Sequence, residues 1–224
     1  MFADITSANV VGYKAEALRE GFTMMTPCFV DVADDNTGLD LTKLIPSGDF
    51  ASEDITIQTL TAEGRSDKFF SYYKPRRGDF RWVDNDGNDV AEGEVVFSPV
   101  QGLWVSGVDG ASITPAGAVS TSDRTITLRE GFTPLGNFTA VALDLTSIVP
   151  GGEIASEDVT IQTLTAEGRS DLFFSFYKPR RGDFRWVDND GNDVAEGDVT
   201  FAPGKGLWVA GVDGATITIP GPTL

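Results

Sequence analysis

Histidine is absent from this 224-residue sequence, and cysteine occurs once, as Cys28. Without imidazole the chain cannot build Ser-His-Asp or Cys-His catalytic machinery, or a zinc site with histidine ligands. A single cysteine allows neither an internal disulfide nor a thiolate cluster, and no imidazole is present to activate it as a nucleophile. These absences exclude many of the common hydrolase and zinc-enzyme mechanisms.

Basic residues are also few, because 17 Lys and Arg stand against 34 Asp and Glu, which gives a net charge of −17. A surface this acidic repels phosphate backbones and anionic lipid head groups, so we expect no nucleic-acid partner. No apolar run approaches the roughly 20 residues of a membrane-spanning helix, so we expect no membrane insertion. With 41% hydrophobic residues, the chain can nevertheless bury a core.

The sequence contains a long internal repeat. Residues 39–114 realign onto residues 143–218 at a constant offset of 104, and 60 of these 76 positions are identical. A shorter match, of residues 18–23 with 128–133, has an offset of 110, because the first copy holds six extra residues in between. A period of this length corresponds to a whole small domain rather than to a solenoid repeat.

Each copy has the pattern of an all-β domain, in which short runs of β-branched and aromatic residues alternate with Gly, Asp, Asn and Pro. Since about eight strands in ~100 residues fit such folds, we predict two tandem β-sandwich or small β-barrel domains, residues 1–116 and 117–224. One helical turn is expected over residues 39–45. In the first copy we expect strands at residues 10–15, 21–26, 54–60, 68–74, 80–84, 94–98, 103–106 and 111–114.

Differences between the copies indicate which way side chains point. In the expected strand 94–98 the changes fall on alternate positions, while Val95 and Phe97 are kept. Because strand side chains alternate between faces, Val95 and Phe97 should point inward. Lys68 is replaced by Leu172 in the second copy, which suggests a position at the boundary between domains that is buried in one copy only.

The few positive charges gather in one short segment of each copy. We predict that this segment is a binding or assembly patch that meets an acidic surface on a neighbouring molecule. The alternatives are a site for a sugar acid or sulfate, with arginine as the donor, and a solvated loop with local Arg–Asp pairs. The patch consists of Lys74, Arg76, Arg77 and Arg81, and of Lys178, Arg180, Arg181 and Arg185. Residues 77–79 also spell Arg-Gly-Asp, the integrin-ligand tripeptide, but a match this short often arises by chance.

A loop rich in Asp, Asn and Gly recurs in both copies and offers oxygen ligands at alternate positions, which suit calcium. An EF-hand loop needs Gly at its sixth position and Glu at its twelfth, whereas Gly87 is fourth and Val95 twelfth here. We therefore favour a hairpin turn and keep a loose calcium site as the alternative. The candidate ligands are Asp84, Asp86 and Asp89, with Asp188, Asp190 and Asp193. No other cofactor is indicated.

Trp82, Trp104, Trp186 and Trp208 are all expected in strands. Exposed tryptophans can stack on sugar rings, as in carbohydrate-binding modules, but in a β-sandwich they more often pack the core, which we favour. Glycoside hydrolysis needs a carboxyl group with a raised pKa, and no carboxylate here lies in an apolar context. We therefore assign no catalytic residues and predict that the protein is not an enzyme.

Two short motifs at the ends of the repeat carry a resemblance. Residues 9–13 read Asn-Val-Val-Gly-Tyr, and residues 203–209 read Pro-Gly-Lys-Gly-Leu-Trp-Val. They resemble uncharacterised secreted bacterial β-domain proteins with a Val-Gly-Tyr opening and a Pro-Gly-x-Gly-Phe/Trp strand, although residues 99–102 of the first copy depart from the second motif. The resemblance implies an extracellular or cell-surface location and no known activity. The missing hydrophobic leader would then have been cleaved or left out of this sequence, with Met1 as the initiator.

These observations lead to a functional expectation. We predict a non-catalytic secreted or cell-surface structural protein that self-associates through its repeated faces into a homo-oligomer or a larger assembly. The alternative is a glycan-binding tandem module that uses Trp and Arg side chains.

Overall fold

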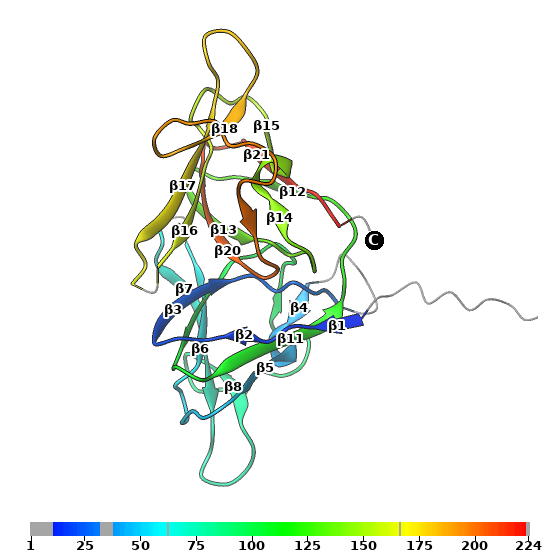
Figure 1. The fold of residues 1–224 in the computed structure, drawn as a ribbon. Coiled ribbons are helices and arrows are strands. Elements are labelled where there is room, and N and C mark those ends of the chain that lie inside the picture. The colour runs from blue at the N-terminus through cyan, green and yellow to red at the C-terminus, as the bar shows by residue number, and fades with distance from the viewer. Residues whose placement is uncertain (1–10, 32–37, 62, 166, 223–224) are drawn as a thin grey trace, which may run out of the picture.

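The computed structural model of the chain describes residues 11–31, 38–61, 63–165 and 167–222. The fold is all-β, as predicted, with 48% of residues in strands and 3% in helices. The strands form small antiparallel sheets that follow one another in a propeller-like ring. In Figure 1 the elements of the first copy, blue to green, build one lobe, and those of the second copy, light green to red, build the other.

Two five-stranded sheets are the largest units, and their strands follow the same order. The order is β3-β10-β6-β7-β8 in the first and β13-β20-β16-β17-β18 in the second. The first sheet consists of β3 (Gly21–Met25), β10 (Leu103–Gly107), β6 (Thr56–Leu60), β7 (Ser66–Tyr73) and β8 (Arg81–Asp84). The second consists of β13 (Gly131–Gly136), β20 (Gly206–Gly211), β16 (Thr160–Leu164), β17 (Ser170–Tyr177) and β18 (Arg185–Asp188).

Smaller sheets complete each lobe. In the first, β11 (Ser112–Ala118) pairs with β1 (Val11–Tyr13), β2 (Glu16–Ala17) and β5 (Leu44–Ser47). In the second, β21 (Thr216–Ile219) pairs with β12 (Arg124–Thr127) and β15 (Val149–Gly151). Two further pairs are β4 (Leu39–Asp40) with β9 (Val96–Phe97), and β14 (Leu143–Asp144) with β19 (Thr200–Phe201).

The expected helical turn is present as a short 3-10 helix, η1 (Leu41–Lys43), and recurs as η2 (Leu145–Ser147). Asp144 caps η2, since its Oδ1 accepts a hydrogen bond of 2.7 Å from the backbone N–H of Thr146. Its Oδ2 accepts from the backbone N–H of Gly197 at 2.5 Å, in the loop after β18. The carboxylate thus fastens the short helix to a loop more than 50 residues away in the sequence.

The strands expected in the first copy have counterparts, although their lengths differ. The expected strand 94–98 is reduced to β9, because Glu94 belongs to a turn in which its Oε2 accepts a hydrogen bond of 3.0 Å from the backbone N–H of Ala91. The expected strand 111–114 instead extends to Ala118, where β11 pairs with β1. Val10, the first residue of the expected strand 10–15, lies outside the described residues.

Each lobe has its own hydrophobic cluster. One cluster contains buried residues of the first copy only, and the other contains residues of the second copy together with Val100 of the first. The expected facing of strand β9 is confirmed, since Phe97 is buried and Val95 packs against the cluster, whereas Val96 is 45% exposed. The prediction that position 172 is buried between domains is wrong, because Leu172 is 47% exposed.

The reason lies in how the two lobes meet, at a surface that we call the joint. The first sheet contributes the end of β3 and the residues before β10, and the second contributes their equivalents, whereas Leu172 lines a cleft within its own lobe. Two β-bridges cross the joint, Met25 with Lys205 and Gln101 with Leu135. Met25 is equivalent to Leu135, and Gln101 is equivalent to Lys205. The two bridges therefore join the same pair of equivalent positions, with the copies exchanged. The joint therefore has approximate two-fold symmetry.

Candidate functional site

Glycines let the two backbones approach closely at the joint. A Cβ added at Gly206 would lie 2.6 Å from the carbonyl carbon of Met24, and one at Gly102 would lie 2.8 Å from that of Pro134. Met24 and Pro134 are equivalent positions of the two copies, so the same close approach occurs twice. Across the joint the backbone N–H of Gly102 donates to the carbonyl of Pro134 at 2.9 Å.

Trp104 and Trp208 meet beside these glycines, with ring centroids 6.1 Å apart in an edge-to-face arrangement. Each is backed by a phenylalanine of its own sheet, since Phe22 lies 5.2 Å from Trp104 and Phe132 lies 5.0 Å from Trp208. The sequence indicated that these tryptophans lie in strands, but not that they meet each other. Pairing of the two aromatic clusters stabilises the joint, because both rings lose contact with water there.

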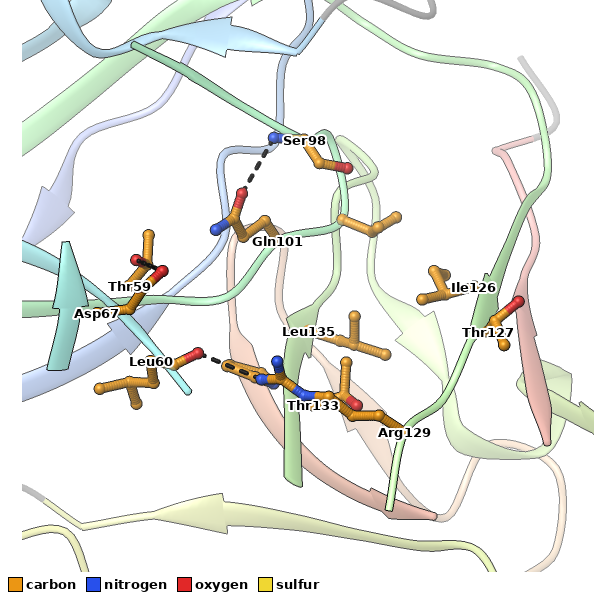
Figure 2. Close-up of a pocket in the computed structure, with 12 residues that line it drawn as sticks. Thr59, Leu60, Asp67, Ser98, Gln101, Ile126, Thr127, Arg129, Thr133 and Leu135 are labelled. Atoms are coloured by element: carbon orange, nitrogen blue, oxygen red, sulfur yellow. Dashed lines mark hydrogen bonds between the residues drawn. The ribbon is translucent and has the colours of Figure 1, made fainter. Parts of the chain in front are cut away.

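A cleft of about 370 Å³ opens at one flank of the joint (Figure 2). Thr59, Leu60 and Asp67 lie on one side of it, and Arg129 and residues of β13 lie on the other. The Arg129 guanidinium donates through Nη2 to the carbonyl of Leu60 at 3.2 Å and through Nε to the carbonyl of Phe132 at 3.1 Å. The Nη2 hydrogen bond therefore links the second copy to the end of β6 in the first.

The equivalent cleft on the other flank, of about 270 Å³, is lined differently. Lys14 Nζ lies 2.5 Å from Glu16 Oε1 and also donates to the carbonyl of Pro203 in the second copy. The two clefts share a threonine, Thr23 in one and Thr133 in the other, whose buried hydroxyl has no hydrogen-bond partner among the described residues. They also share the equivalent arginines Arg19 and Arg129, whereas their other charged groups differ, so the polar set that the clefts have in common is one arginine and one threonine.

Trp82 and Trp186 lie in the cores of their lobes, as favoured from the sequence. The indole N–H of Trp82 donates to the carbonyl of Leu44 at 3.0 Å, and that of Trp186 donates to Ile148 at the same distance. Both rings are buried, as is Trp208, while Trp104 is half-buried. The flat faces that a sugar ring would need are therefore covered in at least three of the four tryptophans.

Six of the eight predicted patch residues fall on the loops that join β7 to β8 and β17 to β18, while Arg81 and Arg185 are the first residues of β8 and β18. We call residues 74–79 and 178–183 the basic loops. Figure 1 shows these loops projecting from opposite ends of the molecule. This placement could not be read from the sequence, because it depends on the two-fold joint.

Each basic loop is anchored at its base by stacked aromatic rings. Tyr72 and Phe80 stack with their centroids 5.1 Å apart, and Tyr72 also contacts the buried Trp82 at 5.0 Å. The ammonium group of Lys74 lies 5.0 Å from the ring centroid of Phe80, which is a cation–π contact. Phe176, Phe184 and Lys178 repeat these contacts in the second copy. The base of the loop is therefore fixed relative to the core.

The structure divides the six arginines of the predicted patch into two kinds. Arg81 Nε lies 2.6 Å from Asp89 Oδ1, and Arg185 repeats the pair with Asp193 at 2.8 Å. Local Arg–Asp pairs of this kind were expected under the alternative interpretation, in which the segment is a solvated loop. In contrast, Arg76 and Arg77 are exposed at the loop tip, and no described residue pairs with their guanidinium groups, nor with those of Arg180 and Arg181.

The Asp-rich loop is a turn that satisfies its own polar groups. Asp84 Oδ1 accepts from the backbone N–H of Asp86 at 2.9 Å and of Asn88 at 2.8 Å, and Asp84 Oδ2 accepts from the side chain of Asn88. Gly87 adopts a φ of +80°, which favours glycine. Hydrogen bonds from the side chain and backbone of Asn88 lower the pKa of Asp84, and those from Asn192 lower the pKa of Asp188.

These bonds account for the loop as a hairpin turn. Asp89 and Asp193 are held by arginines, and the exposed Asp86 and Asp190 complete the six candidate calcium ligands. Within the described residues, no three Asp, Glu, Cys or His side chains form a group arranged to hold a metal ion. Calcium binding stays the alternative interpretation of this loop.

No protein-family model matches the chain, and neither a curated protein nor a solved structure was found to match it. Over the described part of the chain, no helix has the length and apolar character needed to cross a membrane.

Proposed function

We propose that this chain is a non-catalytic structural protein of the cell surface or the extracellular space, and that it links copies of itself through its two basic loops. The observation that carries the proposal is that Arg76 and Arg77 at one end, and their equivalents at the other, are exposed and have no partner among the described residues. A molecule with two equivalent binding ends can join a neighbour at each, so modest contacts add up through avidity. If successive contacts do not close into a ring, they produce a filament or a layer.

Electrostatics support an acidic partner surface. The chain carries a net charge of −17, so the basic loops are local positive sites on a negative molecule. Opposite potentials attract and orient approaching molecules, and arginine forms bidentate hydrogen bonds with carboxylates. Another copy of the chain offers such a surface.

A non-catalytic role is supported by the ionisable groups. Burial raises the pKa of the Cys28 thiol to about 11, which keeps it protonated at neutral pH. General acids among carboxyl groups need a raised pKa. The carboxyl groups with a resolved shift, all of them lowered, are Glu63, Asp84, Asp144, Glu167 and Asp188.

We propose further that the two lobes are tandem domains of one small β fold. The equal strand order of the five-stranded sheets and the separate hydrophobic clusters support this division. Because β11 continues to Ala118, the connection between the domains begins two residues after the expected boundary at residue 116.

The experiment measures self-association of the full chain by light scattering and negative-stain imaging, over a range of protein and salt concentrations. We expect particles that grow with protein concentration at low salt and dissociate as the Debye length falls from about 30 Å to about 3 Å. The double variant R76E/R180E should stay monomeric. R76E alone should weaken assembly less than the double variant does, because one basic loop remains.

The matched control is R65E/R169E, which changes the net charge equally at exposed positions outside the basic loops. It should assemble like the unaltered chain. A chain that is monomeric at every concentration and salt would refute the proposal, and so would equal loss of assembly in both double variants.

The alternative, glycan binding, would rest on the loop arginines alone, because at least three of the tryptophans are buried. An array of sulfated and acidic glycans tests it directly. Binding to such glycans that R76E/R180E abolishes, by a chain that stays monomeric, would favour this alternative.

A further inference from the structure

A pair of equivalent clefts lies at the far end of the hairpin that carries each basic loop. In the first copy, Phe70, Val90 and Val95 line a cleft of about 310 Å³. In the second copy, the equivalent residues Phe174, Val194 and Val199 line a cleft of about 500 Å³. Volumes of 300 Å³ and more are typical of sites that enclose a ligand or a side chain. We call these the acidic clefts, because carboxylates surround their apolar lining.

The charge of both clefts is negative. Asp84 and Glu94 flank the first, and their equivalents Asp188 and Asp198 flank the second. The first cleft is also lined by Lys68, whereas the second has Leu172 there and no basic residue among its lining. The second cleft is therefore larger, more apolar at its rim and free of an opposing positive charge.

The basic loop of the same hairpin cannot fill the cleft. The loop follows the Tyr73–Arg81 pair, whereas the cleft residue Asp84 pairs with Phe70. These pairs are three residues apart, which is about 10 Å at a strand rise of ~3.3 Å. Because aromatic stacking fixes the base of the loop, an occupant with the chemistry of the loop must come from another molecule.

We propose that each acidic cleft receives an arginine from the basic loop of a neighbouring copy of this chain. The guanidinium group pairs with Glu94 or Asp198, because the turn hydrogen bond of each carboxylate involves only one of its two oxygens, and the three-carbon stem lies against the phenylalanine and valines. Arginine suits both parts of the site, since its stem is apolar and its guanidinium is more weakly hydrated than an ammonium group. This inference rests on the proposed function and names the surface that accepts the loop.

The difference between the two clefts gives a directional expectation. Lys68 repels an incoming arginine, whereas Leu172 adds apolar contact for its stem. The second-copy cleft should therefore bind more tightly. K68L should strengthen self-association and L172K should weaken it, each by about tenfold for a change of roughly 1.4 kcal/mol.

The test is charge exchange between loop and cleft. The loop variant R76E/R180E and the cleft variant E94K/D198K are each expected to weaken self-association of the full chain about tenfold or more. Mixed in equal amounts, they should associate again, because reversed loops fit reversed clefts and the unaltered loops of one fit the unaltered clefts of the other. Light scattering and sedimentation of the mixture provide the measurement.

Two controls separate this mechanism from loss of folding or a general charge effect. Glu94 and Asp198 each accept a turn hydrogen bond, from Ala91 and Ala195 respectively, so E94Q/D198N removes the charges and keeps an acceptor. It should weaken association without changing the melting curve. D49K/E153K makes the same charge change at exposed positions away from the clefts and should associate normally.

The outcomes distinguish the two proposals. If the loop variant loses association but the cleft variant retains it, the acidic clefts are not the acceptors, while the proposed function stands. If the mixture of the two variants fails to associate, this inference is overturned. If the unaltered chain never associates, both proposals fall together.

Discussion

Replacing Gly206 with alanine should loosen the joint between the two lobes. The added Cβ would lie 2.6 Å from the carbonyl carbon of Met24 and 2.7 Å from its oxygen, whereas ordinary contacts begin near 3.4 Å. The φ of Gly206 is not in the left-handed region, so the cost is steric rather than a matter of backbone strain. A backbone segment cannot rotate away from a clash as a side chain can. The two backbone segments at Gly206 and Met24 must therefore separate by about 0.8 Å.

Overpacking of this kind typically costs 1–3 kcal/mol, and we expect about 2 kcal/mol for G206A. For a chain of this length, that lowers Tm by about 4–8 °C. G102A makes the equivalent change on the other side of the two-fold axis and should cost a similar amount. The double variant should cost less than the sum, because the first substitution already separates the backbones.

Urea denaturation followed by circular dichroism measures the free energy of unfolding, and hydrogen exchange reports on the joint itself. Two backbone N–H groups donate across it, Thr26 to Gly204 and Gly102 to Pro134, and their exchange should accelerate in G206A. The control is A202S, which places on an exposed position the residue that the first copy has there. If G206A unfolds within about 0.5 kcal/mol of A202S, the close approach described at the joint is wrong.

Three further predictions concern single side chains. W186F should destabilise the second lobe by about 1–3 kcal/mol in urea denaturation, because the buried carbonyl of Ile148 loses its donor; an unchanged midpoint would show that this hydrogen bond contributes nothing. The pKa values of Asp84 and Asp188 are lowered in the folded state, so their stabilisation is present above the unfolded pKa near 3.9 and is lost as the pH falls through the folded value; Tm measured from pH 5 down to about 2 should decline less in D188N than in the unaltered chain. Calcium should leave the melting curve unchanged, because Asp84 and Asp188 are already bonded within their own turns; a rise in Tm that chelator reverses would establish the calcium site instead.

The fold class was readable from the sequence because local signals agree with it. Short apolar runs separated by turn residues gave the all-β class, and the substitutions between the copies gave the facing of Val95 and Phe97. The turn at Asp86-Gly87 followed from residues that favour a positive φ and side-chain hydrogen bonds to nearby backbone groups. Each of these signals acts over a few residues, so no knowledge of the rest of the molecule was needed.

The joint was not readable, because it depends on contacts between residues that lie between about 30 and 180 positions apart in the sequence. Gly102 and Gly206 are identical in the two copies, but so are most of their neighbours, and identity alone does not show that another backbone lies against them. The wrong expectation for Leu172 has the same origin. A change from lysine to leucine indicates a change of surroundings, but the sequence does not show which edge of the sheet faces the other lobe.

The sequence predicted which residues form the candidate site, but not where those residues lie in the molecule. Clustered arginines in an acidic chain pointed to the basic loops, and an aspartate eight residues after Arg81 allowed for the local pair that the structure contains. The position of the loops at opposite ends, and the acidic clefts, both depend on how the hairpins are carried by the sheets. Residues that line one cleft come from three separate segments of the chain, so no single motif marks it.

The two-fold joint also constrains how many repeat units of this kind one chain can contain. Each lobe uses its glycine-lined surface once, against the matching surface of the other lobe, with a cleft left at each flank. A chain with one further unit would expose a tryptophan and an unpaired joint surface to water. That exposure favours aggregation, or association with an unpaired unit of another molecule. Longer relatives built on this plan should therefore carry even numbers of units, added in pairs.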